Sequence, residues 1–96
     1  MAPNFALYVR VKWKHDSDDD PVWYLSELDE DGYETRKIQI YRDGRSEWAD
    51  GNHETDSVGL AEIAFPGVDV VNAMPDFDAE EITAAEFGLA WRNAAR

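Results

Sequence analysis

The residues of this chain that could carry chemistry are carboxylates, and many lie in two runs. The runs are 16–20, with four aspartates, and 27–32, which ends at a glycine. Oxygen-rich segments of this kind can bind Ca²⁺. The second run has acids at the first, third and fifth positions of a calcium loop. Ile38, however, stands at the twelfth position, where a bidentate Glu is required. We therefore expect no metal site.

Other catalytic patterns are weak. His15 and His53 could bind zinc or transfer protons. Neither lies in a motif with the spacing of metal ligands, so we expect both to be exposed loop residues. The chain has no cysteine, which excludes thiolate chemistry and disulfides. It has no glycine-rich phosphate loop and no serine-nucleophile motif. We expect a protein that is not an enzyme, with no catalytic residue and no cofactor.

The elements that position these side chains begin with a clear strand. Apolar and polar residues alternate over 5–14, which predicts a half-buried strand at about residues 4–14. Its apolar face would carry Leu7, Val9, Val11 and Trp13. Its other face would carry Tyr8, Arg10, Lys12 and Lys14.

Shorter extended segments follow at about residues 22–28, 33–41 and 45–49. The turns between them contain Gly32 and Gly44, and Asp-Gly between extended segments is a strong hairpin signal. Residues 58–64 could form a further edge strand. A short helix is expected at 68–74, because Pro75 stops it.

The last element is a helix at about residues 84–94. Thr83 and Glu86 match a capping box, and Phe87 and Trp91 lie on one helical face. The predicted fold class is α+β: an antiparallel three- to four-stranded meander sheet packed on one face by the C-terminal helix, in a single domain of residues 1–96. The helix stripe is expected to rest on Leu7, Val9, Val11, Ile38 and Ile40.

Charge narrows the classes of partner. The formal net charge is −12, from 21 acidic and 9 basic residues. Such a chain repels nucleic-acid backbones and anionic membranes, so neither is expected to bind. No stretch is long and apolar enough to span a bilayer, no targeting segment is visible, and a cytoplasmic location is expected.

One predicted surface is basic, although the chain as a whole is acidic. The polar sides of the first and third strands carry tyrosines and cations, and the ligand-face candidates are Tyr8, Arg10, Lys12, Lys37 and Tyr41. Aromatic and basic residues interleaved on a sheet can bind a small ligand, a nucleotide or single-stranded RNA. Pairing with acids on neighbouring strands is the simpler role. A small-ligand or nucleotide-binding domain is therefore the alternative function.

Four segments of the chain resemble a known family. They are Val11-Lys-Trp-Lys-His15, the run from Glu27 to Lys37, Tyr41-Arg-Asp-Gly-Arg45, and an ending with Ala85-Glu-Phe87 and Trp91. Together they resemble a family of small bacterial, largely actinobacterial, domains of unknown function. The resemblance implies a stand-alone bacterial domain and implies no activity.

The leading expectation is an acidic protein-binding domain. Its size and charge are typical of immunity proteins and antitoxins, which inhibit basic partner proteins such as toxins. Acidic loops around Trp48 would make the contact, using Asp18, Asp19, Asp20, Asp29, Asp31, Asp50 and Asp56. An exposed strand edge at 45–49 or 58–65 would also permit a homodimer by strand addition.

Overall fold

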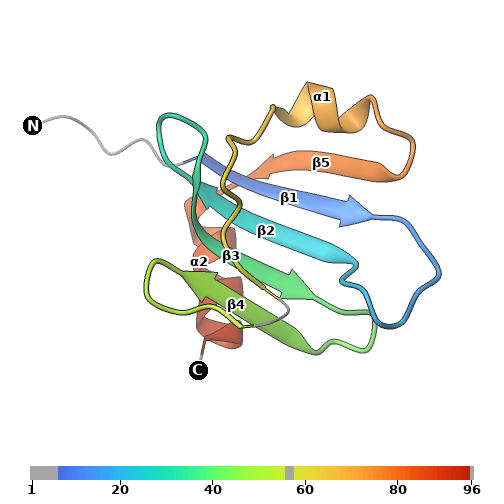
Figure 1. Cartoon of the computed structure of the whole chain (residues 1–96), viewed down its shortest axis with the longest axis horizontal. Helices are drawn as coiled ribbons and strands as arrows, with labels where there is room; N and C mark the ends of the chain where they lie inside the picture. Colours follow the sequence, from blue (N-terminus) through green and yellow to red (C-terminus); the bar gives the residue numbers. More distant parts are fainter. Residues whose placement is uncertain (1–6, 56–57, 96) are drawn as a thin grey trace, which may run out of the picture.

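The computed structural model describes residues 7–55 and 58–95, and its centre is one antiparallel sheet. The strands are β1 (Leu7–Trp13), β2 (Trp23–Leu28), β3 (Glu34–Ile40), β4 (Ser46–Asp50) and β5 (Phe77–Ile82). Their order across the sheet is β4-β3-β2-β1-β5 (Figure 1). The first four strands form the expected meander, and the α+β class with a C-terminal helix packed on the sheet is confirmed.

The strand number is five rather than three to four. The extra strand, β5, pairs antiparallel with β1 from Tyr8 opposite Ile82 to Trp13 opposite Phe77. Its sequence is rich in Asp and Glu, which are depleted in strands, so strand propensity does not predict it. Two ion pairs across the strands offset that weakness. Arg10 lies 2.7 Å from Glu80, and Lys14 lies 3.6 Å from Asp78.

The chain reaches β5 by crossing one face of the sheet. The segment 58–66 passes in front of β3 and β2 in Figure 1 and leads to the short helix α1 (Val68–Asn72). The expected edge strand at 58–64 is wrong, because this segment joins no strand. Instead, Lys37 Nζ donates to the Gly59 carbonyl at 3.2 Å, and the Ala61 amide donates to Glu34 at 2.6 Å.

The second helix, α2 (Ala84–Ala94), covers the other face of the sheet. The capping box is present: the Thr83 side chain accepts from the Glu86 amide, and the Glu86 side chain accepts from the Thr83 amide. Phe87 is fully buried and packs with Leu25 and Ile38. The helix therefore lies on the core that β2 and β3 present.

The predicted packing of the apolar stripe of α2 on the apolar face of β1 is wrong. Tyr8 lies opposite Glu27 and Arg10 opposite Leu25, so these β1 side chains share the α2 face. The Tyr8 and Phe87 ring centroids are 5.2 Å apart. Leu7, Val9 and Val11 point to the opposite face, as strand alternation requires. Alternation identifies two faces, but pairing with β2 decides which one the helix covers.

The opposite face has its own buried residues under α1 and the segment 58–66. They are Val9, Leu28, Ala49, Val58, Val71 and Ala79, none more than 8% exposed. Asn72 ties α1 to the sheet edge, because its amide group donates to the Ala79 carbonyl at 2.9 Å and accepts from the Ala79 amide at 2.6 Å. In the described residues, no helix has the length and apolar character to cross a membrane.

Candidate functional site

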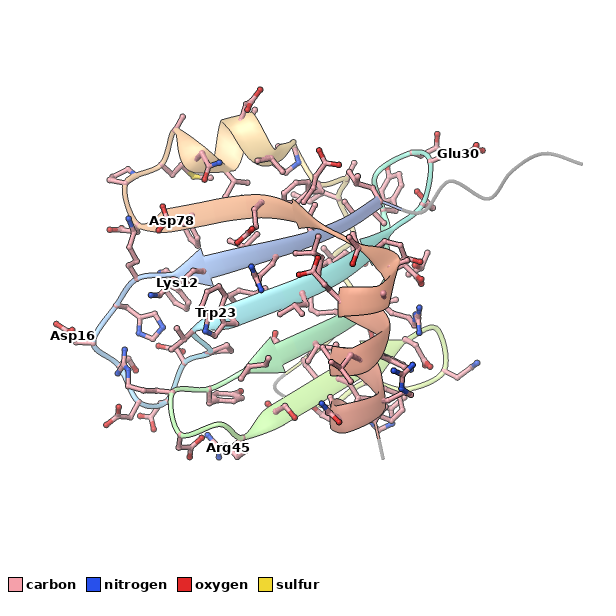
Figure 2. The ribbon with its side chains drawn as sticks, turned by 180° about the vertical axis from the view of Figure 1, so that it is seen from behind. Lys12, Asp16, Trp23, Glu30, Arg45 and Asp78 are labelled. Carbon is pink, nitrogen blue, oxygen red and sulfur yellow. The ribbon has the colours of Figure 1, made fainter. Side chains whose placement is uncertain are left out.

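Helix α2 covers only part of its face of the sheet. Figure 2 shows α2 lying across one end of the strands, while Lys12 and Trp23 lie toward the other end, clear of the helix. We call this region the open half of the α2 face and define it by Arg10, Lys12, Trp23 and Ile40. The register confirms the common face, because Lys12 lies opposite Trp23 and Trp23 opposite Ile40.

Trp23 is the aromatic centre of the open half. It is partly buried, and its ring contacts the edge of the core that Phe87 occupies. The Arg10 guanidinium carbon and the Lys12 ammonium each lie 5.5 Å from its ring centroid. Cations at this distance are attracted to the ring face, by about 0.5–1 kcal/mol at exposed sites. The ring and the two cations therefore form one surface unit.

An open hollow adjoins Trp23 at the end of the sheet. Its volume is about 810 Å³, and it lies between the end of β1, the loop 14–22 and the hairpin 41–45. Its lining includes Lys12, Lys14, His15, Asp16, Trp23, Ile40 and Arg42. Apolar groups, three cations and one carboxylate thus face the same space.

The walls of the hollow are fixed by hydrogen bonds. Arg42 of the hairpin donates to the carbonyls of His15 and Ser17 and pairs with Asp18 at 3.0 Å. The His15 ring accepts from the Ser17 amide at 3.0 Å through Nδ1, and its Nε2 lies 2.8 Å from the Pro21 carbonyl. A neutral ring with its proton on Nε2 satisfies both contacts. The loop is thereby held against the hairpin.

The predicted partner-binding acids do not form one surface. Asp18, Asp19 and Asp20 lie in the loop beside the hollow, where β1 joins β2. Asp29 and Asp31 lie in the β2–β3 turn, at the opposite end of the sheet. A strand of this length separates the two groups by roughly 20 Å.

Two of the predicted acids hold turns together. The Asp29 side chain accepts the backbone amides of Asp31 and Tyr33 at 2.9 and 3.0 Å. The Asp50 side chain accepts the Asn52 amide at 2.8 Å, where the chain leaves β4. These are the local contacts that favour aspartate in turns. Asp56 lies outside the described residues.

Trp48, the predicted contact aromatic, is part of the packing around α2. Its ring stacks on His53 with centroids 3.7 Å apart and meets Trp91 edge to face at 5.2 Å. The side chain is only partly buried, and two aromatic rings of this chain lie against it. Trp23, rather than Trp48, adjoins the hollow.

The predicted ligand face is divided between the two faces of the sheet. Tyr8, Arg10 and Lys12 lie on the α2 face, whereas Lys37 lies on the other face, because it pairs with Ser26, which pairs with Val9. Lys37 is bound to Glu34 at 2.9 Å, and both side chains are nearly buried. Tyr41 is buried and donates to Glu47 at 2.6 Å. That hydrogen bond raises the pKa of Tyr41 to about 12.

Sequence reasoning missed the hollow because the sequence does not encode strand register directly. The available signal was the alternation of Trp23, Leu25 and Glu27, which places Trp23 on the face that Leu25 shares with the core. Among the described residues, no group of three His, Asp or Glu side chains could hold a metal ion. The site is therefore described by an aromatic ring, cations and an open volume.

The fold and the hollow define a small α+β domain with one long helix on an antiparallel sheet and an open half beside it. The model of a family described as a domain of unknown function (DUF6881) matches residues 7–96. The chain belongs to this family. No curated protein and no solved structure gave a significant match.

Proposed function

We propose that this domain is a non-enzymatic binding module for a basic protein, and that its contact surface is the open half of the α2 face with the loop 14–22. The observation that carries the proposal is the position of Trp23. It is a partly exposed tryptophan beside a hollow of about 810 Å³, with two cations against its ring.

The composition of this surface supports protein binding. Tryptophan and arginine dominate the energetically important positions of protein interfaces, usually beside a pocket that excludes water. Trp23 and Arg10 occupy the centre of the open half, and Ile40 adds apolar area. The hydrogen bonds from Arg42 fix the wall of the hollow before a partner arrives, which lowers the ordering cost of binding.

The rim of this surface supports a basic partner. Asp16, Asp18 and Asp19 are exposed on the loop that borders the hollow, and Asp20 is half-buried beside them. The net charge of −12 adds a long-range field of the same sign. Such fields steer oppositely charged proteins into contact and accelerate association at low salt. The acids at the other end of the sheet contribute to the field alone.

Within this class, we propose an inhibitor of the immunity or antitoxin type. Its support is the combination of small size, strong acidity and a preformed surface with an aromatic centre. The partner would be a basic protein such as a toxin, encoded beside this chain. Co-expression with the product of the adjacent reading frame should then yield a stable complex and suppress that product's toxicity.

The test compares matched variants of the domain. A partner is recovered by pull-down from a host lysate or by the co-expression above, purified, and its binding measured by calorimetry and stopped-flow. Trp23→Ala should raise Kd by roughly 30-fold or more, the size expected for an interface hot spot. Asp16→Lys with Asp19→Lys should slow association about tenfold at low salt.

The matched control is Glu30→Lys with Asp31→Lys, which makes the same charge change at the opposite end of the sheet. It should change the association rate by less than about twofold. An unchanged Kd for a folded Trp23→Ala variant would remove the open half from the contact. An acidic partner would overturn the argument from charge.

A further inference from the structure

We propose that the hollow beside Trp23 also binds a small molecule in its own right, one with a flat ring and a single anionic group such as a carboxylate or a phosphate monoester. The ring would lie on Trp23, and the anion would be held by Lys12. This site goes beyond the protein contact, because a ligand can fill it with no partner present.

The position of Lys12 carries the inference. The register of β1 and β5 places Lys12 directly opposite Asp78, which would be its natural cross-strand partner. Asp78 instead pairs with Lys14 at 3.6 Å. On the side of Lys12 toward β2, its ammonium lies 5.5 Å from the centroid of the Trp23 ring. Lys12 thus faces the hollow.

Within residues 7–55 and 58–95, Lys12 forms no ion pair, whereas the cations two residues before and two residues after it each have a carboxylate. Arg10 is bound to Glu80 at 2.7 Å, and Lys14 to Asp78. A chain with 21 acidic residues could readily supply a carboxylate here. An ammonium has three donors, and contact with a ring uses none of them fully. Lys12 therefore keeps its capacity to bind an anion.

The remaining lining suits a flat apolar group. Val22, Trp23 and Ile40 border the same hollow, so a ring placed on Trp23 has apolar neighbours. The volume of about 810 Å³ lies within the range of small-ligand pockets, about 300–1,000 Å³. Because the hollow is open to solvent, affinities in the range of about 0.1–1 mM are expected for fragment-sized ligands.

The experiment uses pairs of probes that differ in charge alone. Indole-3-acetate is compared with indole-3-acetamide, and uridine 5′-monophosphate with uridine, by ¹⁵N NMR titration of the full chain at low salt. The acids should shift the Trp23 indole signal and the Lys12 amide and bind roughly tenfold tighter than their neutral partners, since a charge-assisted hydrogen bond contributes about that factor. The two acids distinguish a carboxylate ligand from a phosphate ligand.

Two variants identify the groups. Lys12→Met keeps most of the apolar side chain, removes the charge and should abolish the preference for the acid. Trp23→Leu should weaken the binding of acid and amide alike. Arg92→Met is the control, because Arg92 is an exposed cation of α2 outside the lining of the hollow.

Equal binding of acid and amide by the wild-type chain, or an unchanged preference in a folded Lys12→Met variant, would overturn the proposal. Shifts of similar size at Arg92, which lies outside the lining of the hollow, would show nonspecific anion binding and would also overturn it. None of these outcomes depends on a protein partner, so the protein-binding proposal stands or fails separately.

Discussion

At the scale of single residues, Arg36 joins the helix to the sheet. Its guanidinium makes two hydrogen bonds to Glu27, at 2.8 and 2.6 Å, and its carbon lies 4.9 Å from the ring centroids of both Phe87 and Trp91. The hydrogen bonds from Arg36 lower the pKa of Glu27 below its ordinary value of 4.5. This ion pair stays charged because two donors of Arg36 bind the two oxygens of one carboxylate.

Glu27→Gln should lower the free energy of unfolding at neutral pH by about 2 kcal/mol, because it leaves a half-buried guanidinium with a neutral acceptor. Since the folded pKa of Glu27 is lowered, its contribution is full above 4.5 and is lost as pH falls through the folded value. Urea unfolding at a series of pH values should show a flatter acid limb for the variant. Glu30→Gln, an exposed turn substitution, is the control, and an identical acid limb for Glu27→Gln would contradict the assignment.

Tyr41 should ionise at about pH 12, above the ordinary range of a tyrosine. The hydrogen bond to Glu47 raises its pKa from 10.0, so the folded state retains the proton when the unfolded state has lost it. The stability that this bond contributes is full below pH 10 and is lost as pH rises toward 12. Tyr41→Phe should remove the late step from an ultraviolet titration. A late step that persists in Tyr41→Phe would assign it to another tyrosine.

At the scale of elements, β5 depends on groups outside its own sequence. Its local propensity is poor, yet β1 pairs with it on one side, and Asn72 of α1 binds the Ala79 backbone on the other. The Asn72 amide occupies backbone groups that a neighbouring strand would otherwise use. Helix α1 therefore stabilises an edge strand and closes part of that edge to other chains.

Asn72→Ala should destabilise the domain by about 1–2 kcal/mol, because the Ala79 amide and carbonyl lose their partners. The loss is local, so hydrogen exchange at the Ala79 amide should accelerate far more than exchange in β2 or β3. Asp69→Ala, an exposed substitution on the same helix, serves as the control. Equal protection at Ala79 in wild type and Asn72→Ala would show that the edge is held by other contacts.

The elements also show what the sequence could predict. The α2 bounds and capping box follow from Thr83, Glu86 and the apolar stripe, because these signals are local. Strand β5 and the crossing of 58–66 depend on distant partners, and the residues of β5 alone favour a loop. Alternation defines the two faces of β1, but which of them α2 covers also depends on a distant partner, strand β2. Locating the open half requires the covered face of the sheet and the register of its strands. The sequence therefore could not predict it.

At the scale of the whole molecule, charge works against stability. A net charge of −12 on 96 residues produces repulsion that is only partly offset by the ion pairs of Arg10, Lys14, Arg36, Lys37 and Arg42. Exposed charges of one sign destabilise the compact state, and salt screens them.

Raising NaCl from about 20 mM to about 300 mM should increase Tm by about 3–5 °C, because screening of the excess acids outweighs weakening of the exposed pairs. KCl should act equally if the effect is screening rather than a bound ion. Differential scanning calorimetry measures both series. A fall in Tm over this range would mean that the ion pairs dominate the electrostatic energy.

The sheet order also determines when the fold can be completed during synthesis. Strands β1 to β4 leave the ribosome in the order in which they pair, so the meander can form as it emerges. The free side of β1 must wait for β5, and Arg10 and its partner Glu80 are 70 residues apart. Until then β1, with its row of apolar side chains, is an unprotected edge of a growing chain. Translation speed through the second half of the sequence therefore sets how long the nascent domain can aggregate.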